Sequence, residues 1–164
     1  MKTLDRISKW MDIQSRVCHL CNCETESHSH LFFSCPFSKR LWEKCKLMAK
    51  LEDISNDWAS IISLISNKPA TNSIWSVIQR LVLGACVYFV WQERNFRCFR
   101  KEFRDVDSLL KTVVGTVRLK LLGLNIRYSP NSIEAANIWD LKIIKDEYYR
   151  RMVEEILKHN YDND

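Results

Sequence analysis

Hydrophobic and polar positions follow a helical period along most of the chain. Downstream of Pro36 and up to Leu51, apolar residues recur three or four positions apart, and the other face carries five basic residues and a single acidic one. The same period predicts a helix over residues 58–65 and another that begins near Asp105 and ends at Gly123. No segment shows the strict alternation that is typical of a strand. The pattern therefore predicts a mostly α protein.

The longest predicted helix covers residues 72–104 and is apolar on nearly all sides in its middle. A helix of this kind must be surrounded by other elements in a water-soluble protein, so we expect it to be the hub of a helical bundle. Its longest apolar run, Leu81 to Trp91, has 11 residues. A bilayer requires about 20, so we expect no membrane-spanning segment and no membrane partner.

Two more amphipathic patterns lie near the ends of the sequence. Residues 2–17 predict a short helix that covers the loop following it, and Asp140 to His159 predict a last helix with mixed charges on its outer side. Polar breaks at residues 52–56 and 67–71 interrupt the pattern, and Pro69 cannot continue a helix. We expect two domains, a small module over residues 1–51 and a helical extension over residues 52–164.

The residues from Cys18 to Trp42 hold four of the seven cysteines and three of the four histidines. The spacing C-x2-C-x8-H-x4-C predicts a metal site with the ligands Cys18, Cys21, His30 and Cys35. Two thiolates separated by two residues can face one ion across a tight turn, and the second pair completes a tetrahedron. Because protein ligands fill all four positions, the pattern indicates one structural Zn²⁺ rather than a catalytic one. The fold expectation is thus a zinc-stabilised CCHC loop module joined to a helical bundle around one long apolar helix.

The ligand set has alternatives. Cys23 can take the place of Cys21, and His28 the place of His30, since both pairs lie within loop reach of one point; His19 is the weakest candidate. Free cysteines can also be simple buried apolar residues. Disulfides are disfavoured by the odd number of cysteines and by the lack of a secretory signal. We expect an intracellular protein, in the nucleus or cytoplasm, that is not secreted.

Several motifs carry a resemblance to a known family. They are Cys18-x-Leu20-Cys21, His30-Leu-Phe-Phe-x-Cys35-Pro36 and, further on, Trp91-Gln-Glu-Arg-Asn95 followed by Phe99. This set resembles the zinc-binding domain that follows the polymerase in non-LTR (LINE-type) retrotransposon reverse transcriptases, above all those of plants. The resemblance implies zinc ligation by the four residues named above and a role in handling RNA during reverse transcription. Cys23 departs from the family pattern, which more often has glycine or another small residue there.

The charge distribution adds a candidate partner. Residues 1–50 contain 9 basic and 5 acidic side chains, an excess that suits a polyanion, so we expect RNA or DNA as a partner, with a reverse transcriptase core as a further one. Aromatic residues at Phe32, Phe33 or Trp42 are expected to stack on bases. The candidate contacts to phosphates are Lys39, Arg40, Lys44, Arg94, Arg97, Arg100 and Lys101.

The last four of these cations are interleaved with phenylalanines at positions 96, 99 and 103. Alternating arginines and aromatic rings suit a surface that contacts phosphates and stacks on bases. The alternative interpretation is that the phenylalanines pack into the core and the arginines are merely solvated.

The motifs of common catalytic sites are missing from the sequence. There is no Asp-Asp dipeptide of the kind that holds magnesium in polymerases, no glycine-rich phosphate loop and no H-E-x-x-H motif. We therefore expect no enzymatic activity and no polymerase activity from this chain. The leading hypothesis is a zinc-dependent nucleic-acid-binding module, and the alternative is a zinc-structured domain that binds other proteins.

Overall fold

The computed structural model describes residues 3, 16–67, 71 and 73–141. Within these residues the fold is helical, without a β-strand; the one β-bridge joins Val17 and Thr25. The predicted mostly α fold is confirmed. The predicted helix over residues 2–17 and the one from Asp140 to His159 lie almost wholly outside the described residues.

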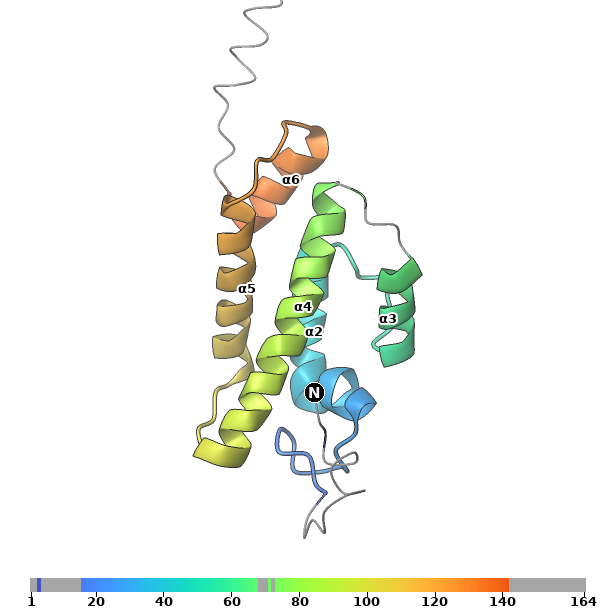
Figure 1. Ribbon diagram of the computed structural model, residues 1–164, viewed down its shortest axis with the longest axis vertical. Coiled ribbons are helices and arrows are strands. Elements are labelled where there is room, and N and C mark those ends of the chain that lie inside the picture. Colours follow the sequence, from blue (N-terminus) through green and yellow to red (C-terminus); the bar gives the residue numbers. More distant parts are fainter. Residues whose placement is uncertain (1–2, 4–15, 68–70, 72, 142–164) are drawn as a thin grey trace, which may run out of the picture.

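Five α-helices and two short π-helical segments make up the described fold. Their bounds are η1 His30–Ser34, α2 Pro36–Met48, α3 Trp58–Asn67, α4 Ile74–Asn95, η2 Phe96–Arg100, α5 Val106–Leu122 and α6 Pro130–Trp139. In Figure 1, α4 runs along the middle, α5 and α3 lie on its two sides, and α2 lies behind it. The loop that precedes η1 lies at one end of this bundle, and α6 lies at the other.

The core forms where α2, α4 and α5 meet. On α5, buried side chains recur every four residues, from Leu109 to Leu121, and on α4 the same spacing runs from Ile78 through Val82 to Cys86. Each such apolar side chain stabilises the fold by about 1.5–3 kcal/mol relative to an exposed position. The predicted amphipathic stripes therefore do face one another.

Local signals in the sequence set the helix boundaries. The side chains of Ser73, Asp105 and Ser129 accept hydrogen bonds from the backbone N–H three residues later, at the starts of α4, α5 and α6. Pro36 stands in the first turn of α2, where its missing N–H has no cost. The continuous helix 74–100 ends at Lys101, which adopts a left-handed conformation with φ 59°. The observed helix is thus slightly shorter than the predicted one over residues 72–104.

Helix α4 is less enclosed than its composition suggests. By length and composition alone, the helix Ile74–Arg100 is long and apolar enough to cross a membrane. The expectation that no segment would qualify, drawn from the 11-residue apolar run, is corrected to this extent. The core helices of water-soluble proteins meet the same criterion. Other helices lie around α4 as predicted, but only 28% of its most apolar stretch is buried, so its middle is enclosed in part. An apolar groove between α4 and α5 runs past Leu81, Ala85 and Tyr88.

Candidate metal centre

The first half of the site is a tight hairpin. The bridge between Val17 and Thr25 closes it, and the backbone N–H of Cys18 donates to the Glu24 carbonyl at 2.8 Å. At the tip, the N–H of Asn22 donates to the Cys18 carbonyl, and Asn22 takes the left-handed conformation that asparagine tolerates better than most residues. This turn places Cys18 and Cys21 on one side of the hairpin.

The second half of the site is built by a π-helical turn. In η1 the N–H of Cys35 donates to the carbonyl of His30, five residues earlier, at 2.6 Å. One π-turn therefore spans the four residues between His30 and Cys35 and brings both side chains to the same side of the chain. Cys35 is also the N-cap residue that directly precedes α2. The spacing between His30 and Cys35 thus has a local geometric reason.

Four donor atoms converge between the hairpin and the π-turn. The Sγ atoms of Cys18, Cys21 and Cys35 and a ring nitrogen of His30 all lie within 4.8 Å of one another. Cys18 Sγ is 3.9 Å from Cys35 Sγ, and Cys21 Sγ is 3.4 Å from His30 Nε2. A tetrahedron with Zn–S bonds of about 2.3 Å and a Zn–N bond of about 2.0–2.1 Å has edges of about 3.8 and 3.5 Å. The donor set and its spacing fit a zinc ion.

The backbone around the two buried thiols is prepared for negative charge. The pKa of Cys18 is raised well above the usual thiol value by its hydrogen bond to Cys35 and by burial, whereas backbone N–H groups of Cys21 and Leu20 act in the opposite direction. The pKa of Cys35 is lowered, mainly because its sulfur accepts a hydrogen bond from Cys18. Burial acts in the opposite direction, and the backbone N–H groups of Phe37 and Ser38, in the first turn of α2, lower the pKa further. Cys18 is thus the donor and Cys35 the acceptor between the two sulfurs, and a bound cation would stabilise both as thiolates.

A carboxylate lies behind the histidine. Glu24 Oε2 is 3.1 Å from His30 Nδ1, the ring nitrogen that faces away from the thiols. Metal-ligating histidines usually place such an oxygen on their second nitrogen, where it fixes the tautomer that leaves Nε2 free to ligate. The backbone N–H of His30 also donates to Ser27 Oγ at 3.2 Å. Sequence reasoning missed Glu24 because its role follows from the fold of the hairpin.

The alternative ligands lie outside the cluster. Cys23 is exposed, and its thiol donates to the Cys21 carbonyl at 3.0 Å. The His28 ring packs edge-on against Phe32, with centroids 5.6 Å apart. His19 Nδ1 lies 3.9 Å from a carboxylate oxygen of Glu26. Of the sets open to sequence reasoning, the one the structure brings together is Cys18, Cys21, His30 and Cys35.

The C-terminal end of α4 supports the hairpin through buried charges. Arg94 donates from Nε and from one terminal nitrogen to the two carboxylate oxygens of Glu26, at 3.0 and 2.9 Å, and both side chains are buried. Arg97 donates to the Leu20 carbonyl inside the Cys18–Cys21 turn, at 2.9 Å. The hairpin and α4 are therefore joined by charge-assisted hydrogen bonds shielded from water.

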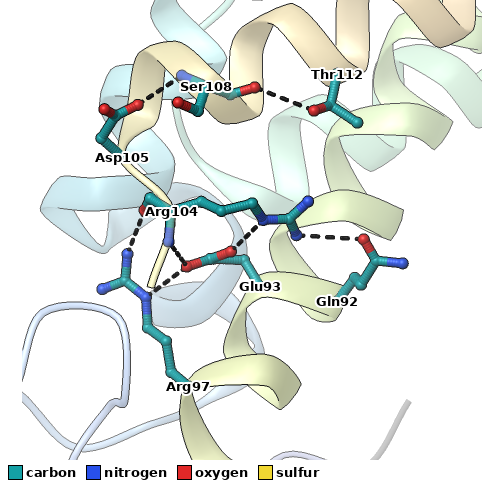
Figure 2. Close-up of polar contacts among 7 residues, drawn as sticks. All are labelled: Gln92, Glu93, Arg97, Arg104, Asp105, Ser108 and Thr112. Carbon is teal, nitrogen blue, oxygen red and sulfur yellow. Dashed lines mark hydrogen bonds and ion pairs between the residues drawn. The ribbon is translucent and has the colours of Figure 1, made fainter. Parts of the chain in front are cut away.

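Glu93 organises the second part of this network (Figure 2). Its carboxylate accepts from Arg97 Nε at 2.8 Å, and from the backbone N–H and the Nε of Arg104 at 2.9 and 2.7 Å. Burial alone would raise the pKa of Glu93, but the hydrogen bonds from Arg104 and Arg97 together lower its pKa. A Glu-Arg pair inside an apolar helix was the sequence signal for this cluster, because buried charges need partners.

These contacts change the interpretation of the candidate nucleic-acid residues. Arg94 is 3% exposed and Arg97 is mostly buried, so neither guanidinium faces solvent as a phosphate contact requires. Lys44 pairs with Asp107, and Lys39 lies 4.0 Å from Glu43. The remaining three candidates, Arg40, Arg100 and Lys101, are exposed.

The aromatic residues are also placed differently from the prediction. Phe32, Phe33 and Trp42 are at most 2% exposed, and Phe33 packs against Trp42 with ring centroids 5.2 Å apart. Stacking of these three rings on bases is therefore excluded in this fold. By contrast, Phe99 and Phe103 are exposed, as a base-stacking surface requires, whereas Arg94 and Arg97 lie inside; the alternative, with these phenylalanines in the core and the arginines solvated, does not describe them.

The cluster lies within the part of the chain that matches a known family. Residues 1–42 match the model of a family described as zinc-binding in reverse transcriptase. The match ends inside α2, so most of the 164 residues lie beyond it. Comparisons with curated proteins and with solved structures give no significant match. The family match and the cluster together support a zinc-binding module, and a domain of this kind is accessory rather than catalytic.

Proposed function

We propose that the chain is a zinc-structured module that binds RNA or DNA, derived from the C-terminal region of a LINE-type reverse transcriptase and without polymerase activity of its own. The observation that carries the proposal is the closed set of three thiols and one imidazole inside the matched segment 1–42. Bound zinc would supply cross-linking of the hairpin, η1 and the start of α2. Since four protein ligands leave no position for a water molecule, its role there is structural.

Exposed cations support the nucleic-acid part of the proposal. Arg40 on α2, together with Arg100 and Lys101 at the end of the long helix, can approach phosphates without breaking a buried ion pair. The sequence has no Asp-Asp dipeptide, which supports the absence of polymerase chemistry. A reverse transcriptase core is the natural protein partner on this proposal, and an intracellular location, in the nucleus or cytoplasm, follows from it.

The alternative function is protein binding. The observation in its favour is the groove between α4 and α5, which is lined by Leu81, Gly84, Ala85 and the half-exposed Tyr88 among others. A partner helix could bury these apolar atoms, and such an interface depends little on salt. The two functions therefore predict different salt dependences.

Fluorescence anisotropy with labelled oligonucleotides tests the proposal. The zinc-loaded chain should bind RNA or DNA with an affinity that falls steeply between low and physiological salt, since each neutralised phosphate releases counterions. The double variant Arg40→Glu, Lys101→Glu should weaken binding about tenfold or more. Its matched control is Lys111→Glu, Lys120→Glu, which makes the same change in net charge at exposed positions of α5. Equal affinities for the two variants, or no binding by the parent chain, would favour the protein-binding alternative.

A further inference from the structure

An exposed aromatic ring is held in place at the lower end of the bundle by a stack of side chains. The guanidinium carbon of Arg97 lies 4.3 Å from the ring centroid of Phe37 and 5.5 Å from that of Phe103. Arg97 cannot move freely, because its nitrogens donate to Glu93 and to the carbonyls of Leu20 and Arg104. The order from inside to outside is therefore Phe37, Arg97 and Phe103.

Phe103 and its neighbour Phe99 are unusually exposed for large apolar residues. Phe99 is 76% exposed and Phe103 65%; among the other large apolar side chains of the described residues, Leu119 is comparable at 72%. Single exposed apolar residues are common on proteins and need no explanation. Two phenylalanines within five positions, one of them held by a buried arginine, form a more specific arrangement.

The cations beside these rings complete the chemistry. Arg100 lies over the Phe96 ring at 4.5 Å, and Lys101, in its left-handed conformation, follows directly. Both are exposed, whereas Arg97 and Arg104 share the carboxylate of Glu93. The exposed Glu102 offsets part of this charge, so the local excess is small. A few cations with exposed aromatic faces suit a ligand that offers flat rings as well as phosphates.

A third cation lies near the same stack from another element. Phe37 and Arg40 are three residues apart in α2, so they share one face of that helix, and Arg40 is exposed. Two elements therefore bring exposed cations to the stack of Phe37, Arg97 and Phe103. Arg40 comes from α2, and Arg100 and Lys101 follow Arg97 in the chain.

We infer that Phe103, together with Phe99, stacks on unpaired bases of a single-stranded nucleic acid, while Arg40, Arg100 and Lys101 contact its phosphates. The inference rests on the proposed function and specifies its ligand. Bases in a duplex already stack on one another, and extruding one costs a few kcal/mol, so exposed phenylalanine faces favour a single strand. The surface is sequence-tolerant, since every base has a π face.

Binding of the zinc-loaded full chain to a mixed-sequence single strand of about 12 nucleotides, and to its duplex, tests the inference. We expect the single strand to bind more tightly. Phe103→Ala should weaken single-strand binding about tenfold, within the range found for base–aromatic stacks. Phe103→Trp should retain it, because the larger ring preserves the stack. Leu119→Ala removes a comparably exposed apolar side chain from α5 and should leave the affinity unchanged.

The outcomes separate this inference from the function on which it rests. If the parent chain binds no nucleic acid, both fail. If it binds, and Arg40→Glu weakens binding while Phe99→Ala and Phe103→Ala do not, the stacking surface is overturned and the proposed function survives. Tighter binding of the duplex than of the single strand would also overturn the inference. Zinc content and the circular dichroism spectrum of each variant establish that it is folded.

Discussion

The metal loop and the C-terminal end of α4 both gather polar side chains at the same end of the bundle, but their sequences specify them in different ways. In the metal loop, the spacing of Cys18 and Cys21 and that of His30 and Cys35 correspond to single local turns. At the end of α4, Arg94 finds its partner Glu26 at a separation of 68 residues. Local spacing can be recognised in a sequence, whereas distant pairing requires the fold.

The two regions also depend on each other. Arg97 donates to a carbonyl of the Cys18–Cys21 turn. Arg94 pairs with the buried Glu26, which follows that turn in the chain. The expectation of a separate module over residues 1–51 and an extension over 52–164 remains untested as a statement about domains. The contacts lead us to expect that the metal loop and the end of α4 unfold together. Variants in each region sharpen this comparison.

The largest effect should come from losing a ligand. Cys35→Ser removes a buried thiol from the four-residue cluster, and structural zinc sites contribute about 10 kcal/mol or more to the folding of small domains. We expect the variant to lose stoichiometric zinc, as measured by mass spectrometry of the metal content. Cys23→Ser is the matched control, because this thiol is exposed and outside the cluster, and it should keep one zinc per chain. Zinc loss by the control instead would reassign the ligands.

Breaking the buried ion pair should have the next largest effect. Glu26→Gln leaves the charge of Arg94 buried without its partner, which should destabilise the zinc-loaded protein by about 3–5 kcal/mol in denaturant unfolding. Glu134→Gln removes the partner of Lys50 in an exposed pair and should cost less than about 1 kcal/mol. Similar losses for the two variants would contradict the tie between hairpin and helix.

Glu93→Gln should have an intermediate effect. The amide keeps the shape of the side chain but loses the charge that accepts from Arg97 and Arg104, so we expect a loss of about 1.5–3 kcal/mol. Hydrogen exchange of the Arg104 amide provides a local measurement, since its N–H donates to Glu93. Exchange should accelerate in the variant, while the Ser108 amide, which is capped by Asp105, should not change. Unchanged exchange at Arg104 would show that the contact is weak.

The smallest effect on stability is expected at the exposed arginine. Arg40→Glu should change the free energy of unfolding by no more than about 0.5 kcal/mol, because the side chain is on the surface of α2. Arg94→Gln, in the buried pair, should destabilise the protein by several times that amount. A large stability loss from Arg40→Glu would mean that its nucleic-acid phenotype cannot be separated from folding.

Much of the fold could be predicted from periodicity alone. The stripes on α2 and α5 face the core as expected, and capping residues such as Asp105 mark helix starts. The partial exposure of α4 could not be predicted, because an apolar helix pattern shows that a surface needs cover but not whether the rest of the fold provides it.

The candidate metal cluster could also be found from spacing, but the roles of the arginines and phenylalanines could not. A guanidinium beside a buried carboxylate is stable inside a protein, whereas an arginine without one stays in water. Glu93, four residues before Arg97, could be found from the sequence, but no pattern near Arg94 indicates that the distant Glu26 will approach it. The interleaving therefore predicted an exposed Phe99 correctly, but it did not show that Arg97 is buried beside Glu93.

X-ray absorption at the zinc edge of the purified, zinc-loaded chain tests the central claim most directly. We predict one zinc with three sulfur neighbours at about 2.3 Å and one nitrogen at about 2.0–2.1 Å, from Cys18, Cys21, Cys35 and His30. A shell of four sulfurs would mean that Cys23 replaces the imidazole. A shell of oxygens, or no bound zinc at all, would contradict the assignment of this cluster as a structural zinc site.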